Sequence, residues 1–448
     1  MIVKVIKMFL LGAVLSATML VSNKIQAQSK DTVRINIEQA LELALNENLT
    51  LKIAEYDLER VDYLRMESKY ALLPSVSANA QYTNNILKPV FFSDFFPGGK
   101  MEVGSSNSYA VTGTLQVPLF SLALYKNIQL SEIELRSVLE SARSTKLDLL
   151  MQVKNTFYGI IMMKESVNVL EQSYKNAKES ADNIRNMFEK GMASEYDKIR
   201  TDVAVRNILP SLSQAKNALE MAKMQLKVLL SLKMDQPIEL EGDFKSLEKD
   251  VMSFAASSEI NLSANSNLKS LDIQMDKLKK NMEIVNSQRL PSLAGFMNYQ
   301  LQMQSEKFTF NNTWANSLSA GFVIQIPIFN KLSLNMKEKQ IQVGIKQMEF
   351  QKQLLSENMT LAVKNAINEM NRAKIQLESD LEAVKQAQKG FEISKVRYST
   401  GAGTVLELND TEVALTKSRL NLNQTIYDFI KARNEYEKIL GQENNIKQ

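Results

Sequence analysis

The chain has 448 residues, enough for two or three ordinary domains, and its 15 glycines and 8 prolines predict long regular elements with few loops. The absence of cysteine and histidine excludes disulfides, thiolate sites, an acylated N-terminal cysteine, and the commonest general base and transition-metal ligand. The net charge of +4 is weak for this length and no basic cluster is interleaved with aromatics, so we expect no nucleic-acid partner. Because histidine and cysteine are absent, we also expect no metal, and we expect no cofactor.

Residues 1–27 have the pattern of a secretory signal peptide. Lys4 and Lys7 form a short basic region, and residues 8–21 are an apolar stretch of 14 residues that ends shortly before Ala27, the expected cleavage point. The alternative is an uncleaved anchor helix, which the shortness of the stretch disfavours. Because no later stretch is long and apolar enough for a membrane helix, we expect an exported protein without a helical span.

The rest of the chain is a tandem repeat. The tripeptide Leu-Pro-Ser at 73–75 recurs at 290–292, an offset of 217 residues, and TLQVPLF at 114–120 recurs as VIQIPIF at 323–329, an offset of 209. The order of matches never changes, which is the signature of a duplication. The first copy therefore has eight extra residues between its paired prolines, near 87–100, and we interpret that segment as an enlarged loop.

Each repeat follows the same plan of helix, β-hairpin, long helix and return helix. Pro118 and Pro327 each end a strand and begin a helix, where a missing N–H costs little. We expect the segment 234–250 to be a connector beside the middle of the helices, and Pro210 to kink the first return helix. The expected repeats are 28–246, with hairpin 74–118, long helix 121–188 and return helix 194–233, and 247–448, with hairpin 291–327, long helix 331–398 and return helix 404–440.

The four predicted strands alternate apolar and polar residues with a period of two. This alternation fits a soluble hairpin on a core, and it also fits a membrane barrel whose apolar side chains face outward. The export signal and the lack of a helical span favour the barrel. Since closed membrane barrels need about eight strands, a chain with four must form an oligomer.

Both long helices carry a seam of apolar residues at alternating spacings of three and four, which is typical of a coiled coil. At about 1.5 Å per residue each helix would be roughly 100 Å long. Lys164 and Lys374 interrupt the seams at equivalent positions. The 22 methionines fit as gap-fillers in such seams better than as metal ligands. The seam residues are Leu150, Val153, Phe157, Ile160, Val167, Leu170, Tyr174, Ala177, Ala181, Ile184 and Phe188, then Val363, Ile367, Met370, Leu377, Val384, Ala387, Phe391 and Tyr398.

Short glycine turns end both long helices. Gly191 lies in FEKGMAS and Gly401 in YSTGAGT, and Ser194 and Thr404 are expected N-caps of the two return helices. The two turns therefore predict two helical hairpins of nearly equal length.

Several strings of the chain resemble the TolC-like outer membrane efflux proteins: INIEQALELALNENLTLKIAEYDLE, LLPS, LQVPLF and RYSTGAGTVLELNDTEVAL. One departure is Leu49, where that family usually has proline. The resemblance implies a homotrimer whose twelve strands form one barrel in outer-membrane lipid and whose helices form a tube in the periplasm. It also implies a passive exit duct that docks a periplasmic adaptor and an inner-membrane pump, either proton-driven or ATP-driven.

The resemblance further implies a periplasmic gate. By position it assigns an acidic ring to Glu407 and Asp410, which lie three apart on one helix face, and a closing hydrogen bond to Asp197 and Tyr398. Gly403 stands where the family's best-known member has a basic residue. An ordinary solvated helix face is the alternative reading of the two acids.

The helix tips are the implied docking surface for the adaptor, and their turn and cap residues are Gly191, Ser194, Gly401 and Thr404.

Three other functions are alternatives to the drug exit duct. An exported coiled-coil scaffold would have no use for the apolar strand face. An enzyme without histidine or cysteine would need a carboxylate or Ser/Lys site, and the sequence has no such constellation, so we expect no catalysis. An ATP-driven type I protein secretion channel stays open as an alternative, because the duct itself converts no energy.

Overall fold

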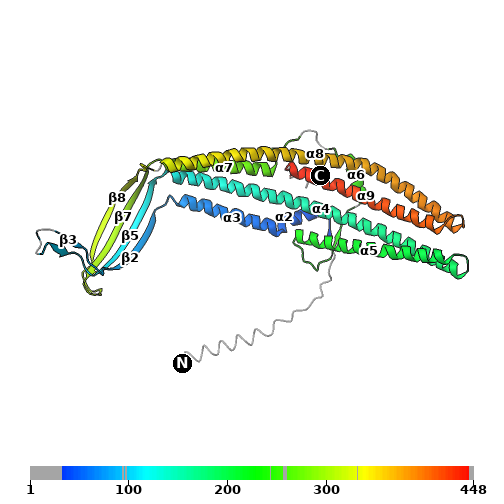
Figure 1. Cartoon of the computed structure of the whole chain (residues 1–448), viewed down its shortest axis with the longest axis horizontal. Helices are drawn as coiled ribbons and strands as arrows, with labels where there is room; N and C mark the ends of the chain where they lie inside the picture. The colour runs from blue at the N-terminus through cyan, green and yellow to red at the C-terminus, as the bar shows by residue number, and fades with distance from the viewer. Residues whose placement is uncertain are drawn as a thin grey trace, which may run out of the picture.

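The computed structural model describes residues 33–92, 95, 98–242, 244–255, 260–329 and 331–442. The predicted signal peptide lies outside these residues. The described chain is elongated, with a sheet at one end and two helical hairpins that extend from it to a pair of tips at the other (Figure 1). Within the described part, no helix is both long and apolar enough to cross a membrane.

The two halves of the chain repeat one order of elements. The first half contains β1 Val33–Ile35, α2 Ile37–Glu47, α3 Leu49–Tyr70, β2 Ser75–Asn84, β3 Val90–Phe92, β4 Lys100–Glu102, β5 Asn107–Phe120, α4 Leu122–Glu189 and α5 Glu195–Leu229. The second contains α7 Ser266–Ser287, β7 Ser292–Ser305, β8 Ala315–Gln325, α8 Lys331–Ser399 and α9 Val405–Ile439, and β6 Ile238–Leu240 and α6 Phe244–Ser253 lie between the halves.

The main sheet is antiparallel, in the order β2-β5-β7-β8, so the two copies of the hairpin pair through β5 and β7. Its register keeps the predicted alternation across all four strands: residues of the apolar set pair with one another, and so do the polar residues between them. Two adjacent rows are Val76, Leu115, Met297 and Ala320 on one face, and Ser77, Thr114, Asn298 and Ser319 on the other.

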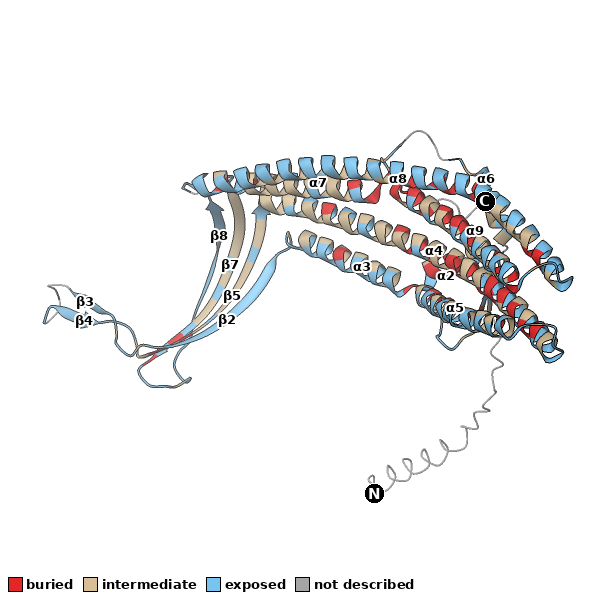
Figure 2. Cartoon of the chain, turned by 45° about the vertical axis from the view of Figure 1, so that its right-hand side comes forward, coloured by how far each residue is buried: buried red, intermediate tan, exposed pale blue. Residues whose placement is uncertain are grey.

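Most residues of the predicted first seam, and several of the second, are buried between helices. Nine of the eleven residues predicted in the first seam are buried, Tyr174 and Phe188 being the two that are half-buried. Val363, Met370, Leu377 and Phe391 are buried in the second. Figure 2 shows the buried residues concentrated along α4 and α9 in the tip half of the molecule, whereas in the sheet the edge strands β2 and β8 are exposed and the central strands β5 and β7 are mostly intermediate. Packing along these seams holds each pair of helices together over its length.

Two asparagines join helices end to end. Asn48 caps α3 by accepting from Thr50 N at 2.8 Å, and its amide also donates to the carbonyl of Leu229, where α5 ends, at 2.8 Å. Asn265 does the same in the second half, accepting from Leu268 N and donating to Ile439 O at 2.7 Å. Each asparagine thus satisfies one terminal donor and one terminal acceptor. Figure 1 shows α5 in line with α3, and α9 in line with α7.

The structure corrects the interpretation of one segment and adds detail to two others. The enlarged loop near 87–100 contains the strand β3, which pairs with β4 in a small hairpin. The connector is partly regular, since β6 pairs in parallel with β1 and is followed by α6. The return helix α5 contains Pro210 within its span, and the expected kink there stays a prediction.

The lysines that interrupt the seams both reach segments between the two repeats. The ammonium of Lys164 lies 4.0 Å from the carboxylate of Glu239 in β6. The ammonium of Lys374 donates to the carbonyl of Phe254, just after α6. The interruptions therefore mark where the connector packs on the helices.

Candidate functional site

The two helix tips lie at the same end of the molecule (Figure 1). Gly191 and Gly401 adopt φ values of 70° and 75°, and a Cβ at either position would meet no atom within 4 Å. Glycine is favoured there by the left-handed backbone rather than by a close contact. Both turns close with matching bonds, from Met192 N to Met187 O and from Ala402 N to Arg397 O, each 2.8 Å long.

The expected caps are present at both return helices. Ser194 Oγ accepts from Asp197 N at 3.1 Å, and Thr404 Oγ1 accepts from Glu407 N at 3.2 Å. Each bond satisfies one of the unpaired N–H groups of the first helical turn. Gly191, Ser194, Gly401 and Thr404 are all exposed, so the four residues assigned to docking lie on an accessible surface.

Asp197 and Tyr398 are close but are not hydrogen-bonded to each other in the described chain. The Asp197 carboxylate accepts from Ser194 Oγ at 2.7 Å. Tyr398 is half-buried against Phe391 and Leu408. Its burial raises the pKa of the phenol, and the negative charge of Asp197 raises it further. Tyr398 therefore stays a neutral donor next to an anionic acceptor that is occupied by serine.

Glu407 and Asp410 are both exposed on the first turns of α9. Glu407 has a cationic neighbour that sequence reasoning missed: a guanidinium nitrogen of Arg397 lies 3.8 Å from Glu407 Oε2 and donates to Ala402 O at 3.0 Å. A basic residue in the last turn of α8 was the available signal. Asp410 has no such cation beside it among the described residues.

The close approach of the backbone favours glycine at position 403. A Cβ there would lie 3.0 Å from Arg397 Cβ and 3.2 Å from Tyr398 N. The turn is therefore tight at this point, and the positive charge of the tip is carried by Arg397 in the preceding helix.

An antiparallel sheet with one apolar face, joined to long helical hairpins that end in paired tips, is the architecture of outer-membrane channels with a helical tunnel. The chain belongs to the outer membrane efflux protein family, whose sequence model matches residues 40–231 and 258–442. The predicted resemblance is thus confirmed, and the family places the protein in the outer membrane with its helices in the periplasm.

Curated relatives and solved structures agree with this assignment. The chain is 21% identical over 408 residues to the toxin and drug export protein A of Aggregatibacter actinomycetemcomitans, covering 89% of this chain and 84% of the relative. It is 19% identical over 375 residues to the outer membrane protein TolC of Vibrio cholerae, covering 81% of each. The structure of the outer membrane protein VceC of Vibrio cholerae shares its fold, with a TM-score of 0.70 at 12% identity over 90% of this chain and 96% of VceC.

Proposed function

We propose that three copies of this chain form a passive exit duct of a tripartite efflux system. The observation that carries the proposal is the register of the sheet, which gathers apolar residues on one face and polar residues on the other. A barrel built from such sheets presents the apolar face to lipid and lines its interior with polar groups. The strands, of 10 to 14 residues, are long enough for the bilayer core.

The edges of the sheet support the trimer. In one protomer β2 and β8 each pair on one side only, so each presents an unpaired row of N–H and C=O groups. Such edges are not tolerated in lipid unless they are paired. Pairing β8 of one copy with β2 of the next extends the sheet around a closed ring.

We expect the detergent-solubilised protein to be a stable trimer, because four strands cannot close a barrel and three copies supply twelve. Mass photometry or light scattering with detergent correction measures this directly. A monomer of 50.7 kDa, or a smaller species after signal cleavage, would contradict the proposal.

The sheet also fixes an expected topology. The helices leave one end of the sheet, so the small β3–β4 hairpin at the opposite end is expected outside the cell (Figure 1). Gly98 and Gly99 form its exposed turn, with φ values of 84° and 69°.

An epitope inserted after Gly98 is expected to be labelled on intact cells, because Gly98 and Gly99 are exposed and a Cβ at either would meet no atom within 4 Å. Antibody staining before and after the outer membrane is broken provides the measurement. The matched control is the same epitope after Gly191, at the helix tip. Labelling of the Gly98 insertion only in broken cells would reject this topology.

The tips are the proposed gate and docking surface. Three copies of Glu407 and Asp410 around one axis would repel one another and attract cations. Closure then needs other contacts, and Tyr398 with Asp197 is the pair that can supply a bond. The exposed turns around Gly191 and Gly401 are the surface proposed to meet an adaptor, which in turn connects to a proton-driven or ATP-driven pump.

Drugs or other small molecules are the proposed cargo, and an ATP-driven toxin export system is the second candidate. The name of the Aggregatibacter relative covers both toxin and drug export. Deleting the gene and restoring it on a plasmid separates the two. Lowered drug resistance that the plasmid restores supports efflux, whereas loss of a secreted protein with unchanged resistance supports secretion.

A further inference from the structure

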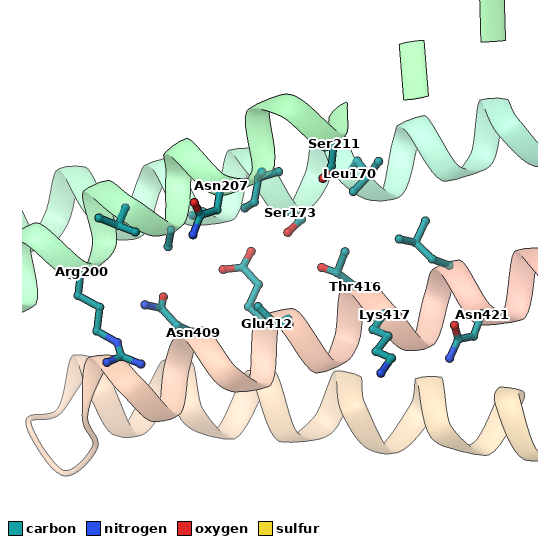
Figure 3. A pocket seen from close by; sticks show the side chains of 16 residues that line it. Leu170, Ser173, Arg200, Asn207, Ser211, Asn409, Glu412, Thr416, Lys417 and Asn421 are labelled. Carbon is teal, nitrogen blue, oxygen red and sulfur yellow. The ribbon is translucent and has the colours of Figure 1, made fainter. Parts of the chain in front are cut away.

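A cavity of about 730 Å³ lies between the two helical hairpins, a few turns above the tips. Its walls come from α4, α5 and α9 (Figure 3). Most of its lining is apolar, as at Val203, Ile208 and Leu420. The volume lies within the range of pockets that hold small molecules. We call it the inter-hairpin cavity.

One acidic side chain points into this cavity. Glu412 of α9 is 5% exposed, and its Oε1 is buried without a hydrogen-bond partner. Figure 3 shows its carboxylate directed across the cavity towards Ser173 of α4 and Asn207 of α5. A buried carboxylate oxygen without a donor is costly, and a structure rarely keeps one without compensation.

The chain's own groups compensate this only in part, since the amide of Asn176 and the more distant ammonium of Lys395 both favour the charged carboxyl. Among the described residues, none forms an ion pair with Glu412. Arg200 lines the cavity, but its guanidinium donates to Tyr196 OH at 2.7 Å. Figure 3 shows the ends of Arg200 and Lys417 well away from the carboxylate. Oε1 therefore stays available to a partner that enters through the cavity when the carboxyl carries no proton.

The protonation of Glu412 is finely balanced. Burial raises its pKa to about 7, although the amide of Asn176 on α4 and the ammonium of Lys395 on α8 lower it. A folded-state pKa above the ordinary value means that the protonated form is favoured below about pH 7 and the anion above it. The site is thus neutral in mildly acidic solution and offers a negative charge in mildly alkaline solution.

We propose that the inter-hairpin cavity binds a primary organic amine, with its ammonium on Glu412 and its apolar body against the lining of α5 and α9. An ammonium has three N–H donors. The carboxylate of Glu412 and the side-chain oxygens of Ser173 and Asn207 are three acceptors in the cavity lining, and Figure 3 shows the carboxylate between the other two side chains. The ligand bridges the two hairpins, so it occupies the wall of the helical tunnel.

Dansylcadaverine, a fluorescent primary amine, is the probe, and its pentyl analogue without the terminal amine is the control ligand. Titrated into the full-length protein in detergent at pH 8, the amine is expected to bind saturably at one site per chain. Glu412→Gln should weaken binding at least tenfold, whereas Asp428→Asn, about four turns along the same helix, should not. Glutamine carries no charge to bury, so this variant is expected to fold as well as the parent.

Two further arms separate a ligand site from a structural role. Because a carboxyl with a pKa near 7 is about one-tenth ionised at pH 6 and about nine-tenths at pH 8, binding should be about tenfold tighter at pH 8. Val203→Phe, which fills the cavity, should abolish binding, whereas Ile199→Phe, an exposed position outside the lining, should not. Equal binding of the two ligands, of parent and Glu412→Gln, or at both pH values would overturn the proposal.

Discussion

Replacing Tyr398 by phenylalanine and Asp197 by alanine together is expected to raise single-channel conductance in planar bilayers. The structure holds Asp197 on Ser194 Oγ at 2.7 Å, with a neutral Tyr398 phenol nearby. In the proposed gate, closure would require the carboxylate to exchange or share its serine donor with the tyrosine. A hydrogen bond to a charged acceptor is worth about 1.5–3 kcal/mol, so three copies would bias the gate by about 4 kcal/mol or more.

The matched control for this double variant is Tyr196→Phe. Tyr196 is exposed on the same tip, and its hydroxyl accepts from Arg200 rather than from an element of the other hairpin. Its loss should leave conductance unchanged. Parental conductance in the Tyr398/Asp197 variant would place closure in other contacts.

The proposed acidic ring is part of the same proposed gate, and its removal is tested by cation block rather than by conductance. Glu407→Ala with Asp410→Ala is expected to weaken block by trivalent cations at least tenfold, because it removes six carboxylates from one axis of a trimer. Arg397→Ala should strengthen the block, because Arg397 lies 3.8 Å from Glu407 and partly neutralises it. Cation block that is the same in both variants and the parent would exclude these residues from the pore.

Features encoded by local spacing were predictable from the sequence. The seam residues, the strand alternation and the caps at Ser194 and Thr404 each follow from residues within a few turns or strand positions. The long-range partners did not follow, because nothing local marks them. Asn48 caps α3, and its second bond goes to Leu229, which is 181 residues away. The contacts of Lys164 with Glu239 and of Lys374 with Phe254 could not be predicted for the same reason.

Two charged residues at or near the tips, Arg397 and Glu412, could have been predicted from the sequence. Arg397 was missed because the resemblance directs attention to position 403, where a Cβ would lie only 3.0 Å from Arg397 Cβ. Glu412 was missed because charged residues are usually exposed. Its spacing shows otherwise, since Val405, Leu408, Glu412 and Leu415 follow one another at steps of three and four, and all four are buried. A charge inside a seam is thus a feature that spacing alone can detect.

The junction between α9 and α7 should be the most sensitive point of the helical part. Gly441 follows α9 with φ at 67°, and a Cβ there would lie 2.2 Å from the carbonyl oxygen of Ala264. Arg143 clamps this contact, because its guanidinium donates to the carbonyls of Ala264 and Gly441 at 3.0 Å each. Gly441→Ala must therefore push the two backbones apart and weaken both bonds of the clamp.

Gly401→Ala is the matched control, because Gly401 has a similar φ of 75° and open space around it. A left-handed alanine costs about 1–2 kcal/mol at either position. At Gly441 the loss of two or three hydrogen bonds adds about 1 kcal/mol each, including the bond from Asn265 to Ile439, for about 4 kcal/mol in total. Thermal unfolding followed by circular dichroism should show a clearly larger fall in Tm for Gly441→Ala. Equal falls would mean that the end-to-end stacking of α9 on α7 yields at little cost, and that the clamp does not hold the two helices in line.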